Sequence, residues 1–183
     1  MAFNFKKLSV PDVILIEPKV YSDDRGYFFE EFKKSEFLSN GISDNFIQEN
    51  ISHSKKGVIR GMHFQKNPKA QSKLVSVING EIFDVALDIR KNSPTFGKWI
   101  GEILSDKNHR SIFIPEGFAH GFCVISEEAD VIYKVNNEYS PNDEGGIIWN
   151  DPSINISWPT QRPIISKKDE ELPLFEKSYE NFF

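Results

Sequence analysis

The chain has 183 residues, of which 39% are hydrophobic and 27% are charged, and this composition predicts one domain over residues 1–183 with a sizeable core. The formal net charge is −5 and the lysines and arginines are scattered along the chain, which argues against nucleic-acid binding. The single cysteine, Cys123, excludes a disulfide within the chain. We find no signal peptide and no apolar stretch of membrane-spanning length, so we expect a cytoplasmic protein without membrane contact.

Short β-rich runs separated by turn residues fill most of the chain. In chain order they cover residues 13–16, 27–32, 46–51, 74–78, 82–89, 99–104, 111–114, 121–125 and 130–135. This spacing is typical of an all-β sandwich or barrel. Helical signals are few: one short helix is predicted over residues 35–40, and a capping box at Ser166 predicts another near the C-terminus.

The dipeptide Asn79-Gly80 lies between two of these runs and favours a type I′ hairpin, because both central residues tolerate positive φ. Counting outward from the turn pairs Val77 with Ile82. One face of the hairpin would then carry Lys73, Val75, Val77, Ile82, Asp84 and Ala86. That face is mostly apolar, so its lysine and its aspartate stand out.

Two segments resemble the two motifs of the cupin family. Residues 57–65 match the glycine and the first histidine of motif one at Gly57 and His63, and residues 115–120 resemble the Pro-x-Gly turn and histidine of motif two. The metal ligands are altered, since Gln65 replaces the second histidine and Lys73 the glutamate. A protonated ammonium cannot coordinate a divalent cation. The resemblance implies a cupin-type double-stranded β-helix, or jelly roll, with short peripheral helices and with no metal and no cofactor.

Five strings together resemble a more specific family, the dTDP-4-dehydrorhamnose 3,5-epimerases. They lie at residues 24–30, 48–50, 60–65, 114–122 and 133–134, and the resemblance extends from about Pro11 to Asp169. It implies an isomerase that inverts C3 and C5 of dTDP-4-dehydro-6-deoxy-D-glucose and gives dTDP-4-dehydro-L-rhamnose, a step of dTDP-L-rhamnose biosynthesis.

Proton exchange beside a ketone needs a base, a group that stabilises the enolate oxygen and an acid on the opposite face. A histidine side chain ordinarily suits the role of a base at neutral pH, which assigns that role to His63, whereas Lys73 supplies a positive charge and Tyr133 can return a proton. The resemblance gives Asp169 as the carboxylate that orients His63.

Substrate-binding positions come mainly from the resemblance. The forked guanidinium groups of Arg25 and Arg60 suit diphosphate oxygens. The resemblance implies contacts with the substrate from Arg25, Glu30, Gln48, Glu49, Asn50, Arg60, Lys73, His120, Glu144 and Lys168, and stacking of Tyr139 on thymine. It also implies a homodimer in which Arg25 and Glu30 reach the neighbour's site.

Three alternatives remain open at the level of sequence. A related enzyme acting at C3 or C5 alone, or on another nucleotide-linked 4-keto sugar, would keep the same base, lysine and acid. A metal-dependent cupin oxygenase or isomerase is disfavoured by Gln65 and Lys73. A sugar-binding cupin without catalysis has no reason to keep base, electrophile and acid together.

Overall fold

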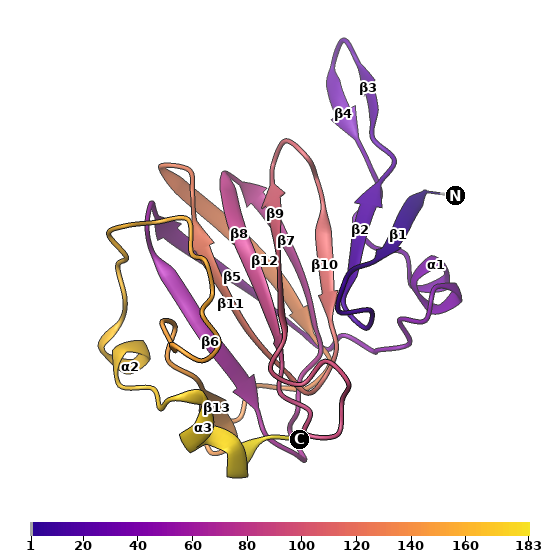
Figure 1. The fold of residues 1–183 in the computed structure, drawn as a ribbon. Helices are drawn as coiled ribbons and strands as arrows, with labels where there is room; N and C mark the ends of the chain where they lie inside the picture. The colour runs from indigo at the N-terminus through magenta and orange to yellow at the C-terminus, as the bar shows by residue number, and fades with distance from the viewer. Residues whose placement is uncertain (1) are drawn as a thin grey trace.

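Two antiparallel sheets face each other in the computed structural model, which describes residues 2–183 (Figure 1). Within these residues, one sheet has six strands in the order β1 (Phe3–Lys7), β2 (Ile14–Pro18), β10 (Ser111–Ile114), β7 (Lys73–Asn79), β12 (Glu128–Val135) and β5 (Gln48–Lys55). The other, over the same described range, has five strands in the order β13 (Glu144–Gly146), β6 (Ile59–Gln65), β11 (Phe118–Val124), β8 (Glu81–Asp88) and β9 (Trp99–Ser105).

Short helices lie at the periphery of this sandwich. They are α1 (Lys34–Ser39), α2 (Lys167–Glu170) and α3 (Phe175–Ser178), followed by a 3-10 turn over Tyr179–Asn181. The predicted all-β jelly roll with short helices is therefore confirmed, and both predicted helices are present. Across residues 2–183, no helix is long and apolar enough to cross a membrane. The expectation of one domain over residues 1–183 stays a prediction.

The predicted hairpin at Asn79-Gly80 is wrong. Strand β7 pairs with β10 and β12, whereas β8 pairs with β9 and β11, so the turn carries the chain from one sheet to the other. Only Gly80 of the two turn residues has a positive φ, at 83°, and a Cβ there would collide with the backbone of Glu128. A crossing between sheets therefore replaces the type I′ turn.

Although the hairpin is wrong, the apolar residues predicted to share its face lie in one core, because the inner faces of the two sheets pack against each other. Its buried members from the six-stranded sheet include Leu15, Val75, Val77, Ile112, Ile114 and Val131, and those from the five-stranded sheet include Ile82, Ala86, Leu104, Phe118 and Phe122. Each large aliphatic side chain buried in this way contributes about 1.5–3 kcal/mol to folding. This core fixes the position of the two sheets relative to each other.

A second core cluster anchors the C-terminal segment against the five-stranded sheet. Phe175 and Phe182 pack with Phe64 and Leu87 in this cluster. Because α2 immediately precedes this anchored segment, the cluster fixes α2 beside β6 (Figure 1).

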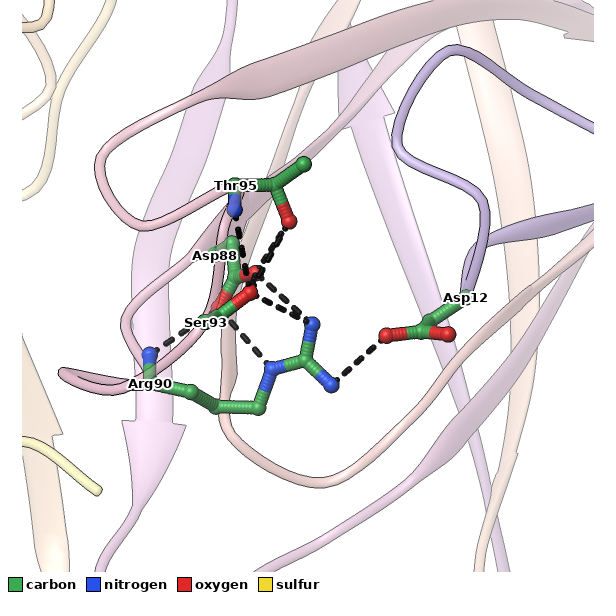
Figure 2. A network of polar contacts seen from close by, with 5 residues as sticks. All are labelled: Asp12, Asp88, Arg90, Ser93 and Thr95. Carbon is green, nitrogen blue, oxygen red and sulfur yellow. Dashed lines mark hydrogen bonds and ion pairs between the residues drawn. The ribbon is translucent and has the colours of Figure 1, made fainter.

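A polar network fixes the end of β8 beside the second cupin motif (Figure 2). The carboxylate of Asp88 accepts hydrogen bonds from Arg90, Ser93 and Thr95, and Arg90 also pairs with Asp12 at 2.7 Å. The Arg90 guanidinium lies 4.6 Å from the centre of the Phe118 ring, the first residue of β11. The network therefore holds the turn from which β11 enters the core.

One hairpin stands apart from both sheets (Figure 1). It consists of β3 (Tyr21–Asp23) and β4 (Gly26–Phe28). Its aromatic side chains are exposed to solvent, with Tyr27 at 60% and Phe28 at 67%. Of the predicted run at residues 27–32, only the first two residues are in this strand.

Candidate active site

A cavity of about 710 Å³ opens between the two sheets. The predicted site residues that line it are Gln48, Asn50, Arg60, His63, Lys73, His120, Tyr133, Tyr139, Glu144, Lys168 and Asp169. They come from β5, β6, β7, β11, β12, β13, α2 and the loop before β13, so the fold gathers residues that are up to about 120 positions apart in sequence.

His63 and Asp169 form a hydrogen-bonded pair at one wall of the cavity. The Nε2 atom of His63 lies 2.7 Å from Oδ1 of Asp169, and the histidine side chain is 33% exposed whereas the aspartate is buried. Burial opposes ionisation of Asp169, but the hydrogen bond and charge of His63 and the N–H of Gly61 hold its pKa below the usual value. The carboxylate therefore stays charged and fixes the tautomer of His63, with Nδ1 left as the basic nitrogen.

Local sequence explains how this pair is positioned. Ser166 caps α2 by accepting a hydrogen bond from the backbone N–H of Asp169 at 3.1 Å, as the predicted capping box requires. Gly61 has φ of 128° and a Cβ at this position would collide with Gly121 on the neighbouring strand. Only glycine allows β6 and β11 to approach here, which brings His63 into register with His120.

Lys73 is a buried cation on the opposite wall. It lies at the start of β7 and its side chain donates to Oε1 of Gln71 at 3.3 Å. Burial lowers the pKa of Lys73 from 10.5 to about 8, against the attraction of Glu144. An amine with this pKa is mostly protonated at pH 7 and is weakly solvated, which suits it to stabilise an anionic oxygen.

Tyr133 lies on β12, next to β7, and its partner in the strand register is Val75. Burial raises the pKa of Tyr133, while the charge of Arg60 opposes this shift. The phenol is therefore neutral at pH 7 and can donate a proton into the cavity.

His120 is the second histidine of the cavity and lies at the centre of β11. Its Nε2 atom is 2.8 Å from Oδ2 of Asp84, a residue with no exposed surface. Because the ring is 9% exposed and lines the cavity, Nδ1 is the nitrogen available to a ligand.

Polar side chains at the mouth of the cavity form a second group. Lys168 donates to Glu144 at 2.6 Å, and the hydroxyl of Tyr139 donates to Glu144 at 2.7 Å. The side chain of Gln48 accepts from the backbone N–H of Tyr139 and donates to Asn50. Tyr139 is 52% exposed and lines the cavity, so its ring is accessible to a planar base.

Arg60 lies on β6, and two hydrogen bonds fix the position of its guanidinium group. Its Nε atom donates to Ser54 at 2.9 Å and one Nη donates to the carbonyl of His53 at 3.2 Å. The guanidinium keeps further N–H groups for an anion in the cavity it lines.

Three predicted substrate contacts lie outside the cavity of this chain. Arg25 is on the projecting hairpin, 90% exposed, and pairs with Asp23 at 2.6 Å. Glu30 follows the same hairpin and lies 3.8 Å from Lys33. Glu49 points to the other face of the sheet from its neighbours on β5 and pairs with Lys134, because side chains alternate along a strand.

Gln65 has a structural task in place of metal binding. Its side chain donates to the carbonyl of Lys69 at 2.6 Å and accepts from the N–H of Ser140 at 2.6 Å, so it ties two loops together at the cavity. Within residues 2–183, no group of three His, Cys, Asp or Glu side chains is arranged to hold a metal ion. At two ligand positions of the cupin metal site this chain has Gln65 and Lys73, and a protonated lysine cannot coordinate a divalent cation.

Sequence reasoning assigned no role to three residues that the structure brings to the site. Ser52 and Gln71 line the cavity, and Asp84 lies behind His120. The polar alternation Gln48, Asn50, Ser52 on a strand could have revealed Ser52, because every second residue faces the same side. The isolated charge of Asp84 on an apolar face was visible, but its partner was not.

Comparisons with known proteins agree with this geometry. The family model for dTDP-4-dehydrorhamnose 3,5-epimerase matches residues 7–177. The dTDP-4-dehydrorhamnose 3,5-epimerase of Shigella flexneri is 56% identical over 167 residues, which cover 91% of this chain and 92% of that protein.

Solved structures match equally broadly. The Bacillus anthracis dTDP-4-dehydrorhamnose 3,5-epimerase with TDP and PPi bound has a TM-score of 0.93 at 47% identity, covering 95% of this chain and 100% of that chain. A Legionella pneumophila dTDP-6-deoxy-D-glucose-3,5-epimerase in complex with dTDP-4-keto-L-rhamnose has a TM-score of 0.92 at 46% identity, covering 95% and 93%. By sequence and by structure, this chain belongs to the dTDP-4-dehydrorhamnose 3,5-epimerase family of isomerases.

Proposed function

We propose that this enzyme inverts C3 and C5 of dTDP-4-dehydro-6-deoxy-D-glucose to give dTDP-4-dehydro-L-rhamnose, by proton exchange without a metal or redox cofactor. The observation that carries the proposal is the placement of His63 and Tyr133 on different sheets that line one cavity. Inversion requires that a proton leaves one face of the sugar ring and arrives at the other. A base and an acid on opposite walls meet this requirement.

The proton is removed on the His63 side. Asp169 accepts the Nε2–H of the neutral imidazole, so Nδ1 takes the proton from the carbon beside the ketone. The electrons of the broken C–H bond move to the ketone oxygen and form an enolate. The charge of Asp169 then stabilises the imidazolium that results.

The enolate oxygen is stabilised by Lys73, whose charge is buried before the substrate arrives and needs little reorganisation during the reaction. Tyr133 then donates its proton to the same carbon from the opposite face, which inverts the centre. The ketone at C4 lies between C3 and C5, so one set of groups serves both carbons, once His63 has released its proton to solvent and Tyr133 has regained one from solvent.

The nucleotide end of the substrate fits the mouth of the cavity. Tyr139 offers an exposed ring for the thymine, and Arg60 offers N–H donors for the diphosphate. The roles of Gln48, Asn50, Glu144 and Lys168 are hydrogen bonds to the same nucleotide or to the sugar.

We further propose a homodimer that completes the diphosphate site. The hairpin β3–β4 projects from its own chain (Figure 1). Its aromatic side chains are exposed, and Arg25, in the turn between the two strands, is 90% exposed. A projecting apolar hairpin is stabilised by packing on a second copy, where Arg25 and Glu30 would reach the neighbour's cavity. The role of Glu49 and the cytoplasmic location stay predictions of the sequence.

Incubation with dTDP-4-dehydro-6-deoxy-D-glucose in deuterated water tests the function directly. We expect deuterium at C3 and C5 and the L-rhamno configuration in the product, located by NMR. Inversion at one carbon alone would identify a mono-epimerase, and the absence of exchange at both would refute catalysis of this reaction. Activity that disappears on exhaustive chelation and returns with a divalent metal would favour the metal-dependent alternative.

A further inference from the structure

Strand β8 carries two aspartates with no exposed surface, four residues apart and on the same face of the strand. Asp88 has the surroundings of a structural carboxylate. Arg90, Ser93 and Thr95 donate to it at 2.6–2.9 Å, so both of its oxygens have partners (Figure 2). A network of this kind offsets the loss of solvation.

Asp84 has very different surroundings. Its Oδ2 atom contacts the ring of His120 at 2.8 Å, and its Oδ1 atom is buried without a hydrogen-bond partner among the described residues. Its neighbours on the same face of β8 are Ile82 and Ala86, which belong to the apolar core. An ionised carboxylate in such a place lowers stability unless a cation is beside it. His120 is the group that can become that cation.

In this geometry a protonated His120 can donate a hydrogen bond into the cavity. Since Nε2 of His120 is directed to Asp84, the N–H at Nδ1 of a protonated ring is available to the cavity that this ring lines. Asp84 itself does not line the cavity, so it acts through the ring. The arrangement repeats the His63–Asp169 pair on the adjacent strand, but the His63 side chain is 33% exposed against 9% for His120, so His63 is accessible as a base.

We propose that Asp84 is a positioning residue that keeps His120 as an imidazolium, so that its cavity-facing N–H donates a hydrogen bond to the ketone oxygen as the enolate forms. This inference rests on the proposed function. His120 keeps its proton throughout, and the enolate receives a hydrogen bond that the neutral ring with Nδ1 unprotonated does not supply.

Several titratable groups from the packed elements line the same cavity as the His120 ring or contact the ring directly. They are His63 and Arg60 from β6, Asp84 from β8, Lys73 from β7, Tyr133 from β12, Glu144 from β13, and Lys168 and Asp169 from α2. The positively charged groups among them oppose a positive charge on His120. The direct contact with Asp84 therefore has to outweigh that repulsion, which makes the protonation state of His120 a sharp test.

Asp84→Asn and Asp88→Asn form a matched pair, because both replace a fully buried carboxylate on β8 with an amide of the same shape. For Asp84→Asn we expect kcat to fall about 10- to 100-fold, less than the about 100- to 1000-fold that follows loss of an oxyanion donor, with KM nearly unchanged. For Asp88→Asn we expect a lower Tm with kcat and KM nearly unchanged, since its partners are structural.

Nitrogen NMR of histidine-labelled protein reads the charge of His120 directly. The chain has 4 histidines, so the His120 signals can be assigned by their absence in His120→Gln. We expect both ring nitrogens of His120 to be protonated in the wild type at pH 7 and the ring to be neutral in Asp84→Asn.

A neutral His120 in the wild type at pH 7 would overturn the proposal even if the Asp84→Asn variant did not fold. So would a loss of kcat that is equally large when Asp84→Asn is made in the His120→Gln background, because a positioning residue has no effect once its ring is gone. A wild-type protein that leaves the sugar protons unexchanged would refute the proposed function instead, and the NMR would still decide the state of His120.

Discussion

His63 and His120 are direct cross-strand neighbours on β6 and β11, and each ring contacts a buried carboxylate, Asp169 at 2.7 Å and Asp84 at 2.8 Å. One wall of the cavity therefore carries two histidine–aspartate pairs side by side. The other wall carries Lys73 and Tyr133 on the adjacent strands β7 and β12. We propose that the sugar binds between the two walls, so that proton removal and proton return take place on opposite sides of the ring.

The buried position of Lys73 predicts opposite pH trends for activity and stability. Its pKa in the folded protein is about 8, against 10.5 when exposed, so the cation needed for enolate stabilisation is lost as pH rises through 8. We expect kcat/KM to fall with a limb near that value, which a pH–rate profile measures.

Stability should change in the reverse direction, because a group with a depressed lysine pKa binds fewer protons in the folded than in the unfolded state between pH 8 and 10.5. Lys73→Met should be more stable than the wild type at pH 7, by on the order of 3 kcal/mol, and this advantage should shrink toward pH 10. A constant difference in the free energy of unfolding across this range would contradict the burial of a charged Lys73.

Arg60 should contribute to binding more than to chemistry. Arg60 lines the cavity, and in the proposed function its free N–H groups bind a diphosphate that does not change during the reaction, so Arg60→Ala should mainly raise KM. A charge-assisted contact of about 1.5–3 kcal/mol corresponds to about 10- to 150-fold in binding. Calorimetric titration with dTDP measures this loss, and an unchanged affinity would remove Arg60 from the diphosphate site.

Much of the site could be predicted because its residues lie in short motifs, whereas the pairing of strands could not. His63, Lys73 and Tyr133 were assigned to one site from the sequence, without knowledge of the strand order. The Asn79-Gly80 turn shows the limit, since its local preference for a hairpin was overridden by the packing of β7 and β8 into different sheets. Strand β6 was missed because Arg60 and Gly61 interrupt the alternation of apolar residues.

Asp84 shows the same limit within the site. Its charge on an apolar face was visible in the sequence, but its partner is 36 residues away on a strand whose register only the folded sheet defines. Arg25 shows the complementary limit, because a single chain does not bring it to the cavity between the two sheets.

If Arg25 acts in a partner's cavity, two defective variants should complement each other. Arg25→Ala and His63→Asn each impair every site of their own homodimers, but a mixed dimer contains one site with an intact His63 and an intact Arg25. Unfolding and refolding an equal mixture should restore about a quarter of the wild-type sites, measured at low substrate concentration. A mixture no more active than the Arg25→Ala protein it contains would show that Arg25 does not act across subunits.

The roles of His63 and Tyr133 can be separated because they lie on opposite walls of the cavity. His63→Asn removes the base, so neither epimerisation nor deuterium exchange at C3 and C5 should remain. Tyr133→Phe leaves the base and Lys73 in place, so the enolate still forms and His63 returns a proton to the face from which it came. The expected result is exchange of deuterium without inversion.

The difference between the two variants is large enough to measure, since a general acid or base contributes about 100- to 10,000-fold. Proton NMR of the sugar in deuterated water reports exchange from the loss of the C3 and C5 signals, and the coupling constants of the product report inversion. A Tyr133→Phe enzyme that inverts both centres at a near-normal rate would show that the acid is another group. A His63→Asn enzyme that still exchanges deuterium would show that the base is another group. Because Tyr133 is half-buried and Phe keeps its ring, an unchanged Tm serves as the control that a loss of inversion reflects the missing hydroxyl.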